Sequence, residues 1–320
     1  MPKVTILMAT YNGIKYISEQ LNSIKNQTLS NWELIVRDDG SKDGTKEYME
    51  GQSQLDKRIT ILEDKFGPTG SPQKNFARLL DHVAKSSTAN YIFFTDQDDV
   101  WLPNKLENFL NVAQNVKSPC LVHSDLTVVD STLNVINPSF FSQMGLPRNS
   151  SKGILYYAFQ NNVTGCACMF SSSLLKSATP VPERVLMHDW WLAMVTSING
   201  TIEFYPESTV CYRQHDKNSV GAFNFKNITS TFKIISKIIK NAASNIISCY
   251  ESIYVLSSRS ENANKDKMMN KLLQSARYSR VRRLFFLIKL GCLPQNFSHQ
   301  VAFVLRHLLT SSKALKKYAK

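Results

Sequence analysis

The sequence lacks a long apolar run and both of the glycine-rich motifs that cradle nucleotide phosphates. No segment of its 320 residues reaches the roughly 18–20 uninterrupted apolar residues that a transmembrane helix needs. The best candidate, residues 284–293, is short and contains Lys289. The motifs G-x-G-x-x-G and G-x-x-x-x-G-K-[ST] are both absent, which argues against dinucleotide binding and against P-loop chemistry. We therefore expect a protein that is soluble or lies on a surface.

Cysteine pairs with metal-binding spacing are also missing. The six cysteines include no C-x-x-C, and Cys166 and Cys168 form only a C-x-C. The first residues show no signal-peptide pattern. We expect six reduced thiols that pack as small apolar side chains in a cytoplasmic protein.

Acidic residues are scarce in the last third of the chain. Residues 222–320 contain 18 Lys and Arg against 3 Asp and Glu, whereas residues 1–221 contain 20 against 22. The net charge of +13 therefore belongs to a basic C-terminal region that follows a nearly neutral body. This change in composition predicts a domain boundary between residues 221 and 222.

Strand-like and helix-like segments alternate along the first 130 residues. Strands are predicted at 3–10, 32–39, 58–64, 90–96 and 120–130, and helices at 14–27, from about 45, at 71–86 and at 104–115. This alternation predicts an α/β fold with a mostly parallel central sheet, right-handed crossovers and flanking helices. Beyond residue 223 the pattern predicts helices, with a linker at 261–271.

Polar residues gather where three predicted strands end. Residues 10–12 follow the first strand, residues 38–40 the second and residues 96–99 the fourth. Ligands of parallel α/β sheets bind beyond the carboxyl ends of the strands. The three clusters therefore predict one shared site.

Asp96, Asp98 and Asp99 need a positive partner, because crowded carboxylates repel one another and resist burial. An EF-hand loop counted from Asp96 fails, since Val100 and Trp101 stand where Asn or Asp and then Gly are required. The letters also fit D-x-D-x-[TV] of phosphatases with an aspartyl nucleophile, but that nucleophile usually follows the first strand. The other interpretations are a solvated acidic turn and a divalent cation held against a diphosphate. Mg²⁺ and Mn²⁺ prefer carboxylate and phosphate oxygens, which favours the cation.

Five stretches of the chain carry motifs in a fixed order: residues 4–28, 32–45, 93–106, 187–195 and 212–221. Together they resemble the family 2 glycosyltransferases of the GT-A fold. "MHDWW" and "YRQH…NSVG" most resemble bacterial rhamnosyltransferases of cell-wall and capsular polysaccharide assembly. The resemblance implies an inverting, metal-dependent transfer of a sugar from a nucleoside diphosphate, with Mg²⁺ or Mn²⁺ as cofactor. Residues 1–221 would be the catalytic domain, divided near 118 into nucleotide-binding and acceptor halves, and 222–320 a basic helical region.

The resemblance assigns roles to residues at the strand ends. The nucleotide-sugar site would comprise Thr10, Tyr11, Asn12, Asp39, Asp96 and Arg213. Tyr11 would stack on the base, Asp39 would lie near the base or ribose, and Arg213 would pair with the diphosphate. The metal ligands would be Asp98, Asp96 and His215. The competing interpretations are packing for Tyr11, a turn cap for Asp39 and a salt bridge with the acidic cluster for Arg213.

Asp189 in "MHDWW" would be the general base that takes the proton of the acceptor hydroxyl. The family usually has Glu-Asp here, and His188 departs from that pattern. Acceptor-binding residues would be Trp190, Trp191, Thr164 and Gly165. A helix N-cap is the competing interpretation for Asp189, and core packing for one of the tryptophans. Asp99 would either support the metal ligands or cap the helix near Asn104.

The expected donor is dTDP-L-rhamnose and the expected acceptor a polyprenyl-linked saccharide, with UDP-hexoses or UDP-GlcNAc as alternative donors. Residues 277–290 mix arginine with an apolar block, which is typical of an interfacial helix on anionic lipid. Aromatic residues are not interleaved as nucleic-acid binding would require. We expect a peripheral protein on the inner face of the plasma membrane that binds no nucleic acid. A tail that only packs on the catalytic domain, and a basic binding protein with a vestigial nucleotide fold, are the alternatives.

Overall fold

The computed structural model describes residues 2–63, 65–116, 119–148, 153–215, 228–260 and 263–319. Contacts divide the chain into two units. Unit 1 comprises residues 1–144, 163–181 and 200–221, and unit 2 comprises residues 145–162, 182–199 and 222–320. The boundary predicted between residues 221 and 222 lies outside the described residues.

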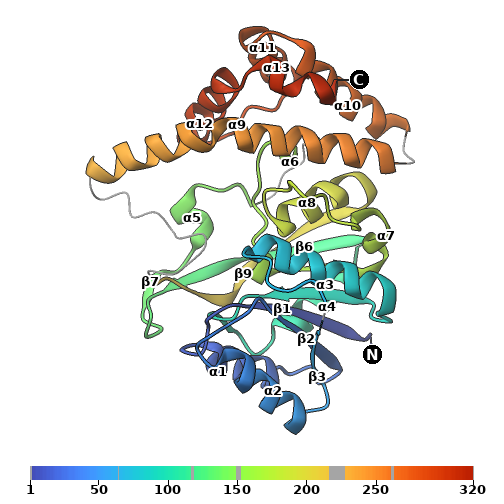
Figure 1. Ribbon diagram of the computed structural model, residues 1–320, viewed down its shortest axis with the longest axis vertical. Helices are drawn as coiled ribbons and strands as arrows, with labels where there is room; N and C mark the ends of the chain where they lie inside the picture. The colour runs from blue at the N-terminus through green and yellow to red at the C-terminus, as the bar shows by residue number, and fades with distance from the viewer. Residues whose placement is uncertain are drawn as a thin grey trace. The chain divides into compact units, whose positions relative to one another are not determined.

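The strands among the described residues of unit 1 form one mixed sheet (Figure 1). Its strands are β1 (Val4–Thr10), β2 (Trp32–Asp38), β3 (Ile59–Ile61), β4 (Tyr91–Thr95), β5 (Val100–Trp101), β6 (Cys120–Val129), β7 (Val135–Asn137), β8 (Cys168–Ser171) and β9 (Thr201–Arg213). They pair in the order β3-β2-β1-β4-β8-β6-β9-β5, with β7 on β6. The predicted parallel pairing is confirmed for β1 to β4. Strand β8, which the sequence did not reveal, lies antiparallel between β4 and β6.

Helices cover both faces of this sheet. They are α1 (Ile17–Lys25), α2 (Thr45–Leu55), α3 (Pro72–Ser86), α4 (Lys105–Gln114), α5 (Phe140–Met144) and α7 (Leu175–Ala178). Side chains of β1 alternate between the faces, as the period of a strand requires. Ile6 and Met8 share a core cluster with Leu21 of α1. On the opposite face Phe94 of β4 packs edge-on against Phe76 of α3, so α1 and α3 lie on opposite sides (Figure 1).

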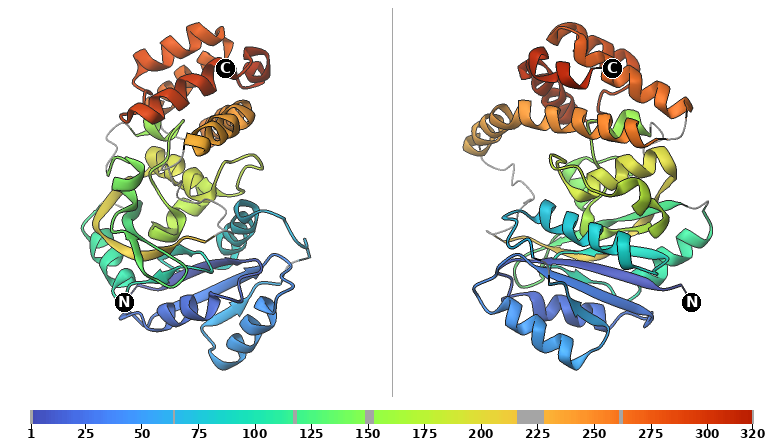
Figure 2. Two further views of the ribbon diagram at one scale, coloured as in Figure 1. Left: turned by 90° about the vertical axis from the view of Figure 1, so that its left-hand side faces the viewer. Right: turned by 45° about the vertical axis from the view of Figure 1, so that its right-hand side comes forward.

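Unit 2 is helical. Its helices are α6 (Ile154–Tyr157), α8 (His188–Asn199), α9 (Ile228–Arg259), α10 (Ala263–Gln274), α11 (Arg280–Leu290), α12 (Phe297–Leu309) and α13 (Ser312–Leu315). Helix α9 is the long gold helix of Figure 2, and α10 and α12 pack against it. Buried Arg283 donates to the carbonyls of His307 and Thr310, which closes the C-terminal end of α12.

Two further sequence predictions can be compared with the described residues. The linker predicted at 261–271 is wrong from residue 263 onward, because Met269, Leu272 and Leu273 are buried on one side of α10. None of the six cysteines, all of which are described, forms a disulfide bond, and five of them are buried. No helix among the described residues combines the length and apolarity needed to cross a bilayer.

Two glycines provide a matched test of the packing in unit 1. A Cβ on Gly200 would lie 2.1 Å from the carbonyl oxygen of Pro119, so Gly200→Ala must displace backbone. We expect it to lower the free energy of unfolding by about 1–3 kcal/mol. Gly51 lies in α2 with open space around its Cα, so Gly51→Ala should raise that free energy by about 0.5–1 kcal/mol. Urea titration measures both changes, and shifts of the same sign would contradict this packing.

Candidate active site

The loop after β1, residues 11–14, is held by side chains from outside it. Its four backbone N–H groups donate, in chain order, to Gln97 Oε1 at 2.9 Å, Ser41 Oγ at 2.8 Å, Thr45 Oγ1 at 2.8 Å and Asp43 Oδ2 at 3.1 Å. Ser41 and Asp43 come from the segment between β2 and α2, Thr45 is the first residue of α2, and Gln97 follows β4. The loop therefore presents Tyr11, whose side chain is 58% exposed, on a fixed backbone.

Thr10 and Asn12 use their polar groups within the protein. Thr10 is buried, and its hydroxyl donates to Asp38 Oδ2 at 2.8 Å. Asn12 has a φ of 48°, and its side-chain oxygen accepts from the Lys42 N–H at 2.9 Å. Thr10 therefore supports the strand ends, and its contact with the nucleotide stays a prediction.

Asp39 is buried and orders the loop that precedes α3. Its two carboxylate oxygens accept from the Thr69 N–H at 2.6 Å, the Thr69 hydroxyl at 3.0 Å and the Gly70 N–H at 2.8 Å. Arg37 donates to the same carboxylate at 3.0 Å and to the Gly67 carbonyl at 2.7 Å. The turn-capping interpretation of Asp39 thus has direct structural support. Its place near the base or ribose stays a prediction.

Two of the predicted metal ligands are in direct contact. A hydrogen bond of 2.8 Å joins His215 Nε2 to Asp98 Oδ2, and both side chains are partly exposed. The His215 ring stacks on Tyr16 with centroids 5.0 Å apart. Half-buried Asp96 lies on the other side of Gln97 in sequence. Carboxylate oxygens with an imidazole nitrogen are a donor set that Mn²⁺ accepts, and the assignment of these three residues as metal ligands stays a prediction.

Asp99 differs from its neighbours because it is fully buried. Burial, followed by the charges of Asp98 and Asp96, raises the pKa of its carboxyl well above the usual value. Its Oδ1 accepts from the Arg213 N–H at 3.0 Å, and α4 begins without a side-chain cap. Asp99 therefore supports the site and does not cap the helix. One ligand atom each from Asp96, Asp99 and Cys166 lie within 4.8 Å of one another, but a buried thiol is a soft ligand that suits Mg²⁺ poorly.

Arg213, at the end of β9, uses its whole guanidinium inside unit 1. It is 1% exposed and donates to the carbonyls of Asp98 and Ser131, each at 2.7 Å. Its remaining nitrogen forms an ion pair of 2.6 Å with Glu19 Oε2, and its guanidinium lies 4.5 Å from the centre of the Tyr16 ring. These contacts give Arg213 an internal role, and its pairing with a diphosphate stays a prediction. The salt-bridge interpretation was closer, although the partner is Glu19 rather than an aspartate.

Lys105 is a second buried basic residue that sequence reasoning missed. Its Nζ donates to the Cys166 carbonyl and lies 3.6 Å from the centre of the Trp101 ring. Burial lowers the pKa of this amine to about 7. A lysine at the start of an amphipathic helix is normally read as solvated, so no local signal marks it. Gln97 was overlooked in the same way, as the variable residue of a D-x-D motif.

The predicted acceptor residues fall into two groups. In unit 1, Thr164 and Gly165 stand at a 3₁₀ turn (Gly165–Ala167) next to Cys166, and so beside the acidic cluster. In unit 2, half-buried Trp190 donates from Nε1 to the Tyr157 carbonyl at 2.6 Å. Trp191 is 1% exposed, which agrees with the core-packing interpretation for one of the tryptophans, and its place in the acceptor site stays a prediction.

Asp189, the predicted base, lies in the first turn of α8 in unit 2. Its Oδ1 accepts from the Trp190 N–H at 2.5 Å and from Asn161 Nδ2 at 3.5 Å. Neighbouring His188 is buried, and burial lowers its pKa to about 3. His188 is therefore neutral at physiological pH and brings no positive charge next to Asp189.

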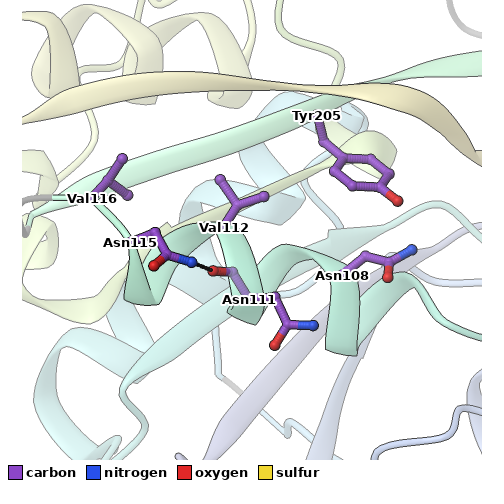
Figure 3. Close-up of a pocket in the computed structure, with 6 residues that line it drawn as sticks. All are labelled: Asn108, Asn111, Val112, Asn115, Val116 and Tyr205. Carbon is purple, nitrogen blue, oxygen red and sulfur yellow. Dashed lines mark hydrogen bonds between the residues drawn. The ribbon is translucent and has the colours of Figure 1, made fainter.

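A separate pocket of about 420 Å³ lies between α4 and β9 (Figure 3). Its lining residues are Asn108, Asn111, Val112, Asn115, Val116 and Tyr205. Tyr205 belongs to the part of β9 that pairs with the start of β6, whereas Arg213 ends the strand at the acidic cluster. None of the predicted site residues lines this pocket.

Residues 5–175 match the family described as Glycosyl transferase family 2. The chain belongs to this family. The dTDP-rhamnosyl transferase RfbG of Shigella flexneri is 32% identical over 231 residues, which cover 67% of this chain and 74% of RfbG. The UDP-Glc:alpha-D-GlcNAc-diphosphoundecaprenol beta-1,3-glucosyltransferase WfgD of Escherichia coli is 24% identical over 245 residues, 76% of this chain and 89% of WfgD.

The fold is also found in solved structures. The mannosyltransferase PcManGT from Pyrobaculum calidifontis, in complex with GDP-Man and Mn²⁺, has a TM-score of 0.54 and 15% identity, covering 99% of this chain and 87% of that one. The predicted α/β GT-A fold, the family and the glycosyltransferase activity are thus confirmed. As a glycosyltransferase, the chain is not a binding protein with a vestigial fold.

The network around Arg213 can be tested through stability. Arg213→Lys should lower the free energy of unfolding by about 2 kcal/mol or more, because a lysine leaves buried carbonyls without charged donors. Glu19→Gln changes the exposed end of the same ion pair and should cost less than about 1 kcal/mol. Urea unfolding of both variants measures the difference. Equal losses would mean that the ion pair, and not the carbonyl contacts, carries the stability.

Proposed function

We propose that this family 2 glycosyltransferase moves L-rhamnose from dTDP-L-rhamnose onto a saccharide carried by a polyprenyl diphosphate, during synthesis of a cell-wall or capsular polysaccharide. The observation that carries the donor is the similarity to dTDP-rhamnosyl transferase RfbG over two thirds of the chain. The diphosphoundecaprenol in the name of WfgD supports the class of acceptor.

In this proposal Asp98, Asp96 and His215 hold Mg²⁺ or Mn²⁺. The bound cation supplies positive charge that neutralises the diphosphate leaving group. The partial exposure of Asp98 and His215 supports this assignment, because ligands to a shared cation must be reachable by the donor. The exposed ring of Tyr11 stacks on the base, and Asp39 positions the loop around it.

Asp189 acts as general base in a single inverting displacement. It accepts the proton of the acceptor hydroxyl as the new glycosidic bond forms and the nucleoside diphosphate departs. Asn161 and the Trp190 N–H bind its Oδ1 and fix the carboxylate. Trp190, Thr164 and Gly165 contact the acceptor. Residues 1–221 form the catalytic domain. Residues 222–320 attach this domain to the membrane surface.

A UDP-hexose or UDP-GlcNAc donor is the second candidate, because WfgD is named as a UDP-Glc enzyme. A panel of dTDP-L-rhamnose, UDP-glucose, UDP-galactose and UDP-GlcNAc separates the two. Donor hydrolysis with Mn²⁺ should be highest for dTDP-L-rhamnose. A preference for a UDP-sugar would overturn the donor while leaving the reaction class in place.

Metal dependence has its own matched pair of variants. Asp98→Asn should lower hydrolysis at least about 100-fold, because one charged contact to the leaving group's cation is lost. Asp99→Asn replaces a buried carboxyl that binds the Arg213 N–H and should retain most of the activity. Both are assayed against Mn²⁺ concentration. Full activity of Asp98→Asn, or full wild-type activity in chelator, would contradict the cation site.

We further propose that unit 2 docks on the inner face of the plasma membrane. Val281, Phe285 and Lys289 recur every fourth residue on α11 and are all exposed, the first two by 56% and 68%. On α12, Phe297 is 78% exposed and Val301 44%. Exposed aromatic and aliphatic side chains among 18 basic residues fit an anionic lipid surface.

Docking through α11 predicts that substitutions on this helix weaken vesicle binding selectively. The double variant Val281→Ser and Phe285→Ser should bind anionic vesicles at least about tenfold more weakly, because each buried methylene contributes about 0.8 kcal/mol. Leu55→Ser removes an apolar side chain that is 80% exposed on α2 of unit 1 and should bind like the wild type. Flotation with phosphatidylglycerol vesicles compares them. Equal binding by both variants would contradict docking through α11.

A further inference from the structure

Gln97 makes two hydrogen bonds to one residue of the neighbouring loop. Its Oε1 accepts from the Tyr11 N–H at 2.9 Å, and its Nε2 donates to the Tyr11 carbonyl at 2.9 Å. Only a carboxamide offers a donor and an acceptor side by side in this spacing. Glutamate would place its second oxygen against the Tyr11 carbonyl, and leucine would make neither bond.

Gly13 leaves space for this amide because it has no Cβ. A Cβ at residue 13 would lie 2.2 Å from Gln97 Oε1 and 2.3 Å from its Cδ, closer than side-chain atoms approach. Gly13 is buried, and its N–H is held independently by Thr45. A Cβ at residue 13 would therefore displace the Gln97 amide from its present position.

The position of Gln97 joins two parts of the site. It stands between Asp96 and Asp98, the proposed cation ligands, and its amide holds Tyr11, whose exposed ring is the proposed stacking surface. The next three N–H groups of the loop depend instead on Ser41, Thr45 and Asp43. Tyr11 is thus the one residue of loop 11–14 whose N–H is tied to the acidic strand end.

We propose that Gln97 is a positioning residue for the nucleoside of the donor: it acts through Tyr11 and sets the distance between the base-stacking ring and the diphosphate's cation. This inference rests on the proposed function. It predicts that Gln97 contributes to binding only when the ligand carries both a nucleoside and a diphosphate. The affinity for inorganic pyrophosphate, which has no base, should not change when Gln97 is substituted.

The test uses the full chain with Mn²⁺ and three probes, namely dTDP, UDP and inorganic pyrophosphate, in calorimetric titrations. Gln97→Glu and Gln97→Leu should raise the Kd of the nucleotide that the wild type binds more tightly by about tenfold. This change corresponds to the net contribution of one or two neutral hydrogen bonds. The Kd of pyrophosphate and kcat at saturating donor should not change. Equal weakening of nucleotide and pyrophosphate, or no weakening of either, would overturn the proposal.

A double-mutant cycle provides a second readout. Gly13→Ala should push the Gln97 amide away and reproduce the tenfold loss, but should add nothing in a Gln97→Ala background, which removes the three atoms nearest to that Cβ. Additive losses would mean that Gly13 acts independently of Gln97, which would contradict the geometry proposed.

Amide exchange in the ligand-free protein separates this inference from the proposed function. Gln97→Leu should speed hydrogen exchange at the Tyr11 N–H and leave the N–H groups of Asn12 and Gly13 unchanged. A wild type that binds no nucleotide would overturn both proposals. A wild type that binds while the Gln97 variants bind equally well would overturn the role of Gln97 alone.

Discussion

The carboxylates that follow β4 depend on Arg213. Three aspartates within four residues would repel one another at a sheet edge, and Arg213 reaches two of them from 114 and 115 residues away. Its backbone N–H binds the buried Asp99, and its guanidinium binds the Asp98 carbonyl and pairs with Glu19. Buried Lys105 donates to the Cys166 carbonyl nearby. The acidic segment is therefore held in place by hydrogen bonds from within the chain.

The same constraint shapes the loops. Parallel strands end at one edge, where the chain leaves the sheet and its N–H groups lose their ladder partners. In loop 11–14 those groups are bound by side chains from the segment after β2 and by Gln97 after β4. Motif residues that resemble ligand-binding positions thus also serve as hydrogen-bond acceptors for the backbone. Asp39 does this for the loop before α3.

Much of the fold could be predicted from the sequence, because runs of β-branched residues and helical periodicity are local signals. The convergence of the three polar clusters followed from the parallel topology. The short strand β8 could not be found, since Cys168–Ser171 carries no alternation and its pairing is set by β4 and β6. The internal roles of Arg213 and Lys105 could not be predicted from the sequence either. Whether a cation is buried depends on partners far along the chain, such as Glu19 at a separation of 194 residues.

Asp98 and Asp99 show how position decides chemistry at this strand end. They are adjacent and identical in type. Asp98 is partly exposed and is hydrogen-bonded to the His215 imidazole, whereas Asp99 is buried and accepts from the backbone at the end of β9. Burial raises the pKa of Asp99, which leaves its carboxyl suited to binding a backbone N–H rather than a cation. Successive side chains point to different sides of a turning chain. A row of aspartates can therefore present charge to a ligand at one residue and anchor its own backbone at the next.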